Sequence, residues 1–406
     1  MDRAARRRAA RSGQTTKPYA ILWSSNAAWA PTGYGTQTKQ VVRRLAADGH
    51  AVAVAANYGL EATSTNWEGI EHFPKGYDGY SNDVIGAYYK DWSRQHPDFT
   101  PAVVTLYDTW VFLNHPGWDT IDRVISWVPI DHDPVPPKVL QWCQRESVTP
   151  VAMSKFGSAA LTRAGVEHVC IPHGIDVDIY KPTPVIVAGD NKPLTGRQIM
   201  RVPEDAHVTG IINANKGVTP VRKSFDTALL AWSIFAKDKP DAWLYIHSER
   251  HGGMGGIPFE PLIQATGAPQ ERIAWVNQYQ LRIGIPDEAM AALYTGLDTL
   301  LAPTLGEGFG LTVAEAAACE TRPIVQDWTA QPELVADGWK VGGQPLWDPA
   351  QDSWFSVPSV PQIVKALEES YETKGQRSPA GRQHIVDNYN ANTLYVEGWR
   401  PLLESL

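Results

Sequence analysis

Two carboxylates and a glycine turn make residues 304–315 (TLGEGFGLTVAE) the part of the chain best suited to chemistry. Glu307 and Glu315 lie eight residues apart, on either side of a Gly-Phe-Gly turn. Eight residues make about two helical turns, so both carboxylates can face one ligand. The short apolar run before the turn predicts a buried parallel strand. The alanine-rich run after it predicts a helix that begins near Leu311.

The turn between the two glutamates predicts an anion site. A strand, a glycine turn and a helix together direct backbone N–H groups and the positive end of the helix dipole at a ligand. Gly308 and Gly310 can take positive φ and let a ligand approach the backbone closely. Hydroxyl-binding carboxylates beside a phosphate site suit a nucleotide sugar. A GxG turn is also a common structural loop, and the second glutamate is what favours the ligand site.

The residues around this turn carry a specific resemblance. The segment DEAMAALYTGLDTLLAPTLGEGFGLTVAEAAACETRPIV, residues 287–325, resembles the E-x7-E region of the retaining glycosyltransferases of family 4, which have the GT-B fold. The chain departs from that pattern by Thr304 in place of serine and by Glu320 in place of glycine. The segment CIPHGIDVDIYKP resembles the family's linker, with His173 for asparagine and Tyr180 for phenylalanine.

The resemblance implies that the second half of the chain binds the donor. Lys223 matches the lysine that meets the donor diphosphate, with Arg222 beside it and Asn215 in the polar loop before it. A cation there stabilises the charge that builds on the leaving nucleoside diphosphate. Glu315 matches the glutamate that binds the ribose, and Glu307 the one near the donor sugar, where we expect binding and electrostatic support. Backbone contacts to sugar and phosphate are expected from Gly308, Phe309, Gly310 and Leu311.

The first half of the chain offers two further loops. WAPTGYGTQT follows a predicted strand and precedes a helix, so Gly33 and Gly35 can bring backbone N–H groups near the donor phosphate. ISWVPIDHDPVPP places Asp131, His132 and Asp133 at the carboxyl end of a strand, where open α/β sheets bind ligands. His132 is expected to orient the acceptor hydroxyl or relay its proton, with Asp131 fixing the imidazole. The same three residues also fit a D-x-D metal motif or a capped turn.

The elements that must position these residues alternate short apolar runs with amphipathic segments, which is an α/β pattern. With the resemblance, it predicts a GT-B fold of two Rossmann-like domains facing a central cleft. We expect an acceptor domain at 17–180, a donor domain at 181–385 and a helix at 386–406 that crosses back to the first domain. Residues 176–203 are expected to be an irregular connection. Strands are expected at 19–23, 51–55, 103–106, 124–128, 150–153, 208–213, 242–247, 272–276 and 300–303.

Composition limits the class of protein. The chain has 406 residues, of which 43% are hydrophobic and 20% charged, as in soluble globular proteins. No apolar run approaches the roughly 20 residues of a membrane span, and the start lacks the apolar core of a signal peptide. Three widely spaced cysteines argue against a disulfide framework or a zinc site. We expect a cytoplasmic protein, free or peripheral to the inner face of the membrane.

The net charge of −8 is unevenly distributed along the chain. Its first eleven residues are basic, because five of them are arginine. Residues 1–16 are expected to form a disordered basic arm. This arm is either a solvated terminus or a tether to an anionic membrane surface or a nucleic acid. The acidic remainder argues against a broad nucleic-acid footprint.

The sequence and the resemblance together predict a retaining glycosyltransferase that requires no metal and no cofactor, with a nucleoside-diphosphate sugar as co-substrate. A saccharide or lipid-linked saccharide is the expected acceptor. Hydroxymethylated bases of DNA are the alternative, suggested by the arginine arm and by 16 tryptophans that can stack on bases. From another class, a nucleotide-sugar epimerase or a non-catalytic sugar-nucleotide binder stays open.

Overall fold

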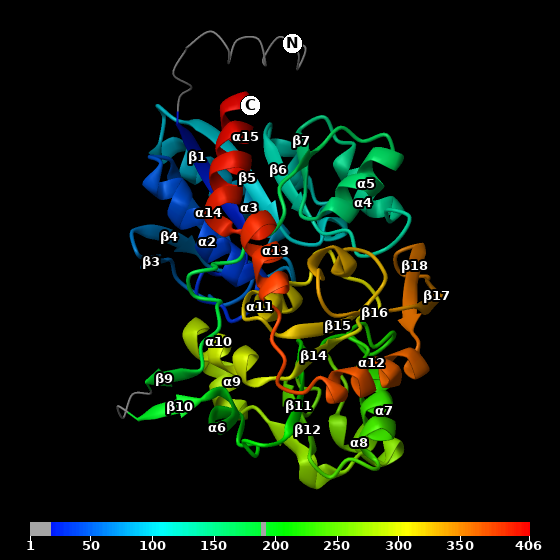
Figure 1. The fold of residues 1–406 in the computed structure, drawn as a ribbon. Coiled ribbons are helices and arrows are strands. Elements are labelled where there is room, and N and C mark those ends of the chain that lie inside the picture. Colours follow the sequence, from blue (N-terminus) through cyan, green and yellow to red (C-terminus); the bar gives the residue numbers. More distant parts are fainter. Residues whose placement is uncertain (1–17, 188–191) are drawn as a thin grey trace. The chain divides into compact units, whose positions relative to one another are not determined.

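The structure is a computed structural model, and it describes residues 18–187 and 192–406 (Figure 1). The chain forms two compact α/β units, each described here by itself. Unit 1 runs to Gly174 and includes Ala350–Ser353 and Ala391–Leu406. Unit 2 comprises Ile175–Pro349 and Trp354–Asn390. The expected basic arm lies outside the described residues.

Unit 1 is built on a sheet with the strand order β3-β4-β2-β1-β5-β6-β7-β8. All neighbouring strands in it pair in parallel except β3 and β4. The strand order reverses between β1 and β5, and open α/β sheets bind ligands at such a switch point. The strands are β1 (Tyr19–Ser25), β2 (Ala51–Ala56), β3 (Thr65–Trp67), β4 (Ile70–Phe73), β5 (Thr100–Leu106), β6 (Val124–Val128), β7 (Val148–Ala152) and β8 (Val169–Cys170).

Helices follow most of these strands, as the alternating pattern predicts. Every residue of β1 and β6 is buried, which is why both strands are mostly apolar, with Ser24, Ser25 and Ser126 as their polar residues. The helices of unit 1 are α2 (Gly33–Ala47), α3 (Asn82–Gln95), η1 (Thr109–Phe112), η2 (Pro116–Thr120), α4 (Pro137–Cys143), α5 (Lys155–Arg163), α14 (Ala391–Leu394), η5 (Tyr395–Trp399) and α15 (Arg400–Ser405).

The C-terminal segment packs on unit 1. Trp399 of η5 contacts Trp23 of β1 and Trp127 of β6, with ring centroids 5.7 and 5.0 Å apart. The Arg400 guanidinium and the Tyr395 hydroxyl both donate to the Asp48 carboxylate, at 2.6 and 2.8 Å. The predicted crossing back to the first unit is therefore confirmed.

Unit 2 contains a six-stranded parallel sheet with the order β13-β12-β11-β14-β15-β16. Its switch point lies between β11 and β14. The strands are β11 (His207–Ile212), β12 (Ala242–His247), β13 (Ile273–Trp275), β14 (Thr299–Ala302), β15 (Arg322–Gln326) and β16 (Trp339–Val341). Two smaller two-stranded sheets join β9 (Val185–Val187) to β10 (Pro193–Thr195) and β17 (Gly343–Asp348) to β18 (Ser353–Pro358).

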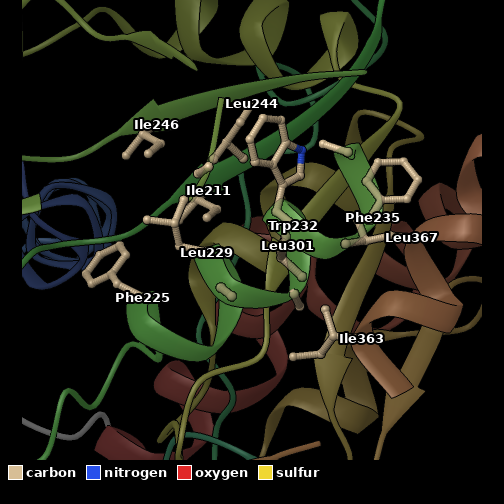
Figure 2. Packing of buried hydrophobic residues seen from close by; sticks show 14 of the residues in the cluster. Ile211, Phe225, Leu229, Trp232, Phe235, Leu244, Ile246, Leu301, Ile363 and Leu367 are labelled. Carbon is tan, nitrogen blue, oxygen red and sulfur yellow. The ribbon is translucent and has the colours of Figure 1, made fainter. Parts of the chain in front are cut away.

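The helices of unit 2 cover this sheet and share one apolar core. Figure 2 shows Trp232, Leu244 and Leu367 meeting in it, contributed by a helix, a strand and a later helix. All three are fully buried. The helices are α6 (Gly196–Met200), α7 (Phe225–Ala236), α8 (Phe259–Thr266), η3 (Gln270–Arg272), α9 (Gln278–Ile283), α10 (Asp287–Gly296), α11 (Leu311–Ala318), η4 (Gln331–Leu334), α12 (Val360–Glu372) and α13 (Pro379–Tyr389).

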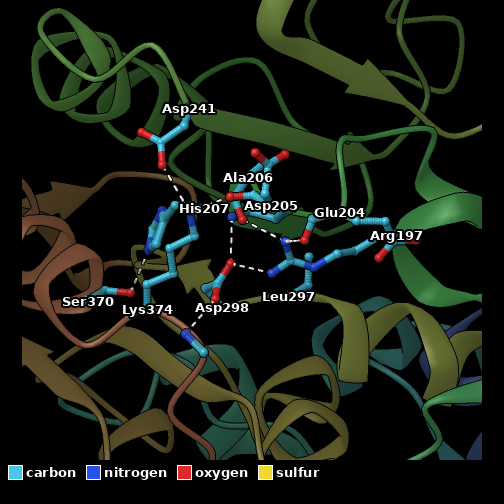
Figure 3. Close-up of polar contacts among 12 residues, drawn as sticks. Arg197, Glu204, Asp205, Ala206, His207, Asp241, Leu297, Asp298, Ser370 and Lys374 are labelled. Carbon is cyan, nitrogen blue, oxygen red and sulfur yellow. Dashed lines mark hydrogen bonds and ion pairs between the residues drawn. The ribbon is translucent and has the colours of Figure 1, made fainter.

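A buried carboxylate holds β11 and β14 together at their amino ends. Asp298 Oδ2 accepts a hydrogen bond from Arg197 Nη2 at 2.8 Å (Figure 3) and another from Val208 N at 2.7 Å. Its Oδ1 accepts from Gly375 N at 2.9 Å. A buried charge is tolerated because it is paired and hydrogen-bonded in this way. The network fixes the two strands side by side, so their carboxyl ends emerge next to each other.

Two expectations about the connection differ from the structure. Residues 176–203 are not irregular throughout, because they include β9, β10 and α6, whose start is fixed by a capping box of Thr195 and Gln198. The units divide after residue 174 and after residue 390, whereas we expected residues 180 and 385. Ile175 already belongs to unit 2 because its N–H donates to the Tyr389 carbonyl at 2.7 Å. The Arg382 guanidinium likewise donates to the carbonyl of Tyr180.

Candidate functional site

The loops that leave the switch point of unit 2 are joined by hydrogen bonds. Leu305 N donates to the Arg222 carbonyl at 2.9 Å, and Arg222 Nη1 donates to the Gly306 carbonyl at 3.0 Å. The Lys223 ammonium donates to Glu307 Oε1, and Arg222 Nη1 lies 3.6 Å from Glu307 Oε2. Three predicted donor-site residues thus meet where the sheet topology favours a ligand.

The charge of this cluster suits an anion. The side chains of Lys223 and Glu307 are only 14% and 12% exposed, so their pairing is weakly screened by water. Arg222 is 36% exposed. Two cations face one carboxylate, and the three side chains together carry one positive charge. A diphosphate can therefore interact with both cations.

The backbone of Glu307 is held by a residue that sequence reasoning missed. Glu307 N donates to Thr329 Oγ1 at 3.0 Å, and Thr329 is buried with a φ of 53°. The Gln331 side chain nearby donates to the carbonyl of Ala302, the last residue of β14, at 2.8 Å. The loop after β15 thus supports the loop after β14. Nothing in the sequence around Thr329 indicates this role, because the contact spans 22 residues.

Helix α11 begins directly after the glycine turn, as predicted. Gly310 is its N-cap with a φ of 105°, and a Cβ there would lie 3.3 Å from Leu334. Gly308 does not take a positive φ, so only one of the two glycines uses that freedom. No side chain caps this end, and the first turn holds no acidic residue, so the positive end of the helix faces the turn. The ring of Phe309 is buried against Tyr389.

Glu315 lies inside α11 and is buried. Its Oε2 accepts a hydrogen bond from the Tyr294 hydroxyl at 2.7 Å, and the Tyr180 hydroxyl is also bonded to it. Burial, reinforced by the Glu315 charge, raises the pKa of both phenols well above its usual value. Both tyrosines therefore stay protonated and orient the carboxylate. Sequence reasoning did not assign them this role.

Asn215 has a structural task in this structure. Its Nδ2 donates to the carbonyls of Glu249 and Ile257 at 2.9 and 2.7 Å, and its Oδ1 accepts from Ile257 N at 3.0 Å. A Cβ on Gly256 would lie 2.1 Å from the same Oδ1. The side chain expected to bind the donor thus fixes the glycine-rich loop after β12. These partners lie 34 and 42 residues away, beyond the reach of a motif.

In unit 1, Gly33 and Gly35 lie in the first turn of the helix that follows β1. Helix α2 begins at Gly33, which is exposed. The N–H of Gly35 donates to Thr32 Oγ1 at 3.0 Å and caps the helix in this structure, and its contact with the donor phosphate stays a prediction. A Cβ on Gly35 would lie 2.2 Å from the Ala30 carbonyl oxygen. Close packing therefore also requires a glycine at this position.

The loop after β6 brings Asp131 and His132 together as predicted. His132 Nδ1 lies 2.7 Å from Asp131 Oδ1, and the imidazole is 3% exposed. Asp133 turns to a different partner, since Arg163 Nη2 donates to its Oδ1 at 2.8 Å. Across residues 18–187 and 192–406, no group of three or more His, Cys, Asp or Glu side chains is placed to hold a metal ion. That the reaction requires no metal stays a prediction.

Comparison with solved structures identifies the architecture. Sucrose-phosphate synthase from Thermosynechococcus elongatus superimposes with a TM-score of 0.70 over 95% of this chain and 100% of its own, at 15% identity. HepE from Anabaena, solved in complex with UDP-glucose, superimposes with a TM-score of 0.65 over 94% of this chain and 98% of its own, at 12% identity. Both alignments span both units. The chain has the GT-B fold.

Within this GT-B chain, similarity at the level of sequence concentrates in unit 2. The family model described as glycosyl transferases group 1 matches residues 217–368. That range contains Arg222, Lys223, Glu307 and Glu315, but neither Asp131 nor His132. The O-antigen chain mannosyltransferase B of Escherichia coli is 30% identical over 100 residues, which are 22% of this chain. The matched part spans about a quarter of that relative's length, 26%.

Membrane association was the remaining expectation. In the part of the chain that the structure describes, no helix is both long and apolar enough to span a bilayer. The predicted contact of the arginine arm with a membrane or a nucleic acid lies outside the described residues.

Proposed function

We propose that this protein is a retaining glycosyltransferase of family 4 type, which moves a sugar from a nucleoside-diphosphate sugar to an acceptor hydroxyl in the cytoplasm. The observation that carries the proposal is the cluster of Arg222, Lys223 and Glu307 at the switch point of unit 2. Both the sugar-nucleotide complex of HepE and the group 1 family match support it.

The donor diphosphate would bind between the cations and the amino end of α11. Its phosphate oxygens replace the Glu307 carboxylate as partners of Lys223, and Arg222 remains beside them. Backbone N–H groups at Gly310 and Leu311 face the same anion. Glu315, fixed by Tyr294, accepts hydrogen bonds from the ribose hydroxyls. Positioned cations and helix dipoles are expected to stabilise the leaving diphosphate most strongly in the transition state.

The chemical step joins the acceptor to the anomeric carbon. The acceptor oxygen forms a bond to C1 on the face from which the bond to the diphosphate oxygen breaks, which retains the configuration. The acceptor proton passes to the His132 imidazole or to the leaving phosphate oxygen, and Asp131 fixes the orientation of the imidazole. Glu307 lends negative charge near the positive anomeric centre. No metal ion enters this scheme.

A saccharide or a lipid-linked saccharide is the proposed acceptor. Similarity to two proteins supports this class: one is an O-antigen chain mannosyltransferase, and the other, WaaG, is a glycosyltransferase involved in lipopolysaccharide biosynthesis.

A ligand screen tests the proposal most directly. Thermal unfolding is followed with UDP-, GDP-, ADP- and TDP-sugars, because a ligand that binds the folded state raises the melting temperature. One donor family should stabilise wild type and fail to stabilise Glu315→Ala. Absence of stabilisation by every donor would contradict the proposal.

A second readout decides the reaction. After turnover in EDTA, proton NMR of the product should show the anomeric configuration of the donor. An inverted product would refute retention, and complete loss of turnover in EDTA would refute metal independence. Formation of an epimerised sugar without any acceptor would instead identify an epimerase.

A further inference from the structure

Four aromatic side chains are in successive edge-to-face or tilted ring contact beside the switch point of unit 1. Tyr107 directly follows β5, and its ring centroid lies 5.7 Å from that of Tyr34 and 5.8 Å from that of Tyr80. Trp110 continues the row 6.1 Å from Tyr80. Tyr34 comes from the first turn of α2, directly downstream of β1. These residues, here called the aromatic wall, therefore stand where the sheet order favours a ligand.

The wall is only partly covered and keeps polar groups at its surface. All four side chains are partly exposed. Among residues 18–187 and 192–406, nothing is hydrogen-bonded to the hydroxyls of Tyr80 and Tyr107 or to Trp110 Nε1. Burial, with a smaller effect of Asp108, raises the pKa of Tyr107 to about 12, so its hydroxyl is a donor at neutral pH. Each ring thus offers an apolar face and a polar edge.

The wall is held in place from behind by Asn82. Its Nδ2 donates to Asp78 Oδ2 at 2.8 Å and to the Val111 carbonyl at 3.1 Å, and its Oδ1 accepts from Trp118 Nε1 at 2.7 Å. Asp78 Oδ2 also accepts from Tyr80 N at 3.0 Å. The loop that carries Tyr80 and the helix η1 that carries Trp110 are thereby tied together. Because this surface is already ordered, binding a ligand does not incur the entropic cost of ordering its side chains.

We propose that the aromatic wall binds a sugar ring of a neutral saccharide acceptor. The proposal rests on the proposed function and adds the location and the chemical class of the acceptor. A pyranose matches the wall because its C–H face packs on aromatic rings while its hydroxyls reach the polar edges. The neighbouring carboxylates of Asp78 and Asp108 disfavour the phosphates of a nucleic acid. The wall therefore favours the saccharide over the DNA alternative.

The experiment measures sugar binding to variants of the wall. Saturation-transfer NMR is recorded with the methyl glycosides and α-linked disaccharides of glucose, galactose and mannose, each at about 10 mM so that millimolar affinity is detected. We expect Tyr80→Ala and Tyr34→Ala each to raise the Kd of the bound sugar about tenfold, within the range measured for stacking on aromatic rings. Tyr80→Phe keeps the ring and should change the Kd less than threefold, roughly the effect of one hydrogen bond.

Controls separate the wall from folding and from the donor site. Tyr279→Ala removes a tyrosine of unit 2 that is 72% exposed and should leave the sugar Kd unchanged. Every variant should keep the melting temperature of wild type and its stabilisation by the donor. The proposal is overturned if no sugar binds wild type, or if folded Tyr80→Ala and Tyr34→Ala bind sugar as wild type does. A single-stranded oligothymidylate that displaces the sugar from wild type also overturns it.

Failure of the wall and failure of the proposed function give different results. If donors bind and are slowly hydrolysed while the wall variants keep their sugar affinity, the wall proposal fails and the transferase stands. If sugars bind in a wall-dependent way but no nucleotide sugar binds, the saccharide site stands and the transferase fails.

Discussion

The ammonium of Lys223 donates a hydrogen bond to the carboxylate of Glu307 across a sequence separation of 84 residues. The pair joins the loop after β11 to the loop after β14, at the point where the strand order of unit 2 reverses. Neither side chain faces much water in this arrangement. A donor diphosphate that binds Lys223 therefore exchanges one anionic partner for another, and the cation is never left buried without a counter-charge.

Replacing Lys223 tests this exchange. Lys223→Met keeps the apolar stem but removes the charge that we propose meets the leaving diphosphate, so we expect turnover to fall about 100-fold or more. Steady-state kinetics with the donor found in the screen measures the loss. Lys239→Met is the matched control, because Lys239 is also ion-paired within unit 2, to Glu368 at 2.7 Å. Equal losses in both variants would mean that a general fold defect, and not the lost charge at the site, limits turnover.

We expect Glu315 to contribute mainly to donor binding and His132 mainly to the chemical step. Glu315→Ala removes the carboxylate that Tyr294 orients, and we expect donor affinity to fall at least tenfold, about 1.4 kcal/mol. His132→Ala should lower turnover by about 10² to 10⁴-fold, the usual range for acid–base catalysis, with donor affinity kept. Calorimetry with the donor and kinetics with saturating acceptor measure the two effects. Equal loss of donor affinity in the two variants would refute the division.

Local patterns predicted most of the sheet framework. Val124–Val128 and Ala242–His247 were expected as strands and are strands with those bounds. Apolar runs between polar loops are sufficient for this, because a parallel strand is buried on both faces. The start of α11 at Leu311 was also predicted from local sequence, because the glycine turn before it marks the boundary of the helix. These features depend on neighbours in sequence.

Features that depend on distant partners were not predicted. Thr329 holds the backbone of Glu307 across 22 residues, and Asn82 reaches the Val111 carbonyl in η1 across 29. For Asn215 and Gly35, the residue type was noticed but the loop-fixing and capping contacts were not, because a short polar side chain or a glycine serves packing and capping as readily as ligand binding. The aromatic wall was not predicted from the sequence for a related reason, because its four rings come from three separate segments of the chain.

Close packing at Gly35 can be tested separately from phosphate binding. Gly35→Ala would place a Cβ 2.2 Å from the Ala30 carbonyl oxygen, so the start of α2 must shift. We expect a loss of about 1–3 kcal/mol in the free energy of unfolding, as for other overpacked sites. Gly79→Ala is the control, because nothing lies within 4 Å of a Cβ there. Urea unfolding that finds both variants as stable as wild type would contradict the packing argument.

The C-terminal segment should stabilise unit 1 chiefly through Trp399. Trp399→Ala empties a fully buried position between Trp23 and Trp127, and such truncations cost about 3–5 kcal/mol. Val396→Ala in the same segment alters a side chain that is 47% exposed and should cost less than about 0.5 kcal/mol. Chemical denaturation followed by circular dichroism compares them. Similar stabilities for the two variants would show that the segment contributes little through this tryptophan.

The pH dependence of stability should trace to buried His173, which stacks on Trp127 with ring centroids 4.3 Å apart. Burial lowers the pKa of His173 from 6.5 to about 3. Well above pH 6.5 neither the folded nor the unfolded chain protonates it, so it adds no pH dependence there. Below that pH, His173 is protonated in the unfolded chain but stays neutral in the folded chain. The free energy of unfolding therefore falls until about pH 3. At pH 5 this loss is about 2 kcal/mol.

His173→Asn removes this ionisation while keeping a polar side chain of similar width. Urea unfolding at pH 7 and pH 5 should show that wild type loses about 2 kcal/mol more than the variant between the two conditions. Burial also lowers the pKa values of His207 and His247 to about 4, but both residues are present in both proteins and cancel in the comparison. His251→Asn, at an exposed histidine, should keep the pH dependence of wild type. If His173→Asn also keeps it, His173 is protonated in the folded chain at pH 5, and the stacked, neutral imidazole is wrong.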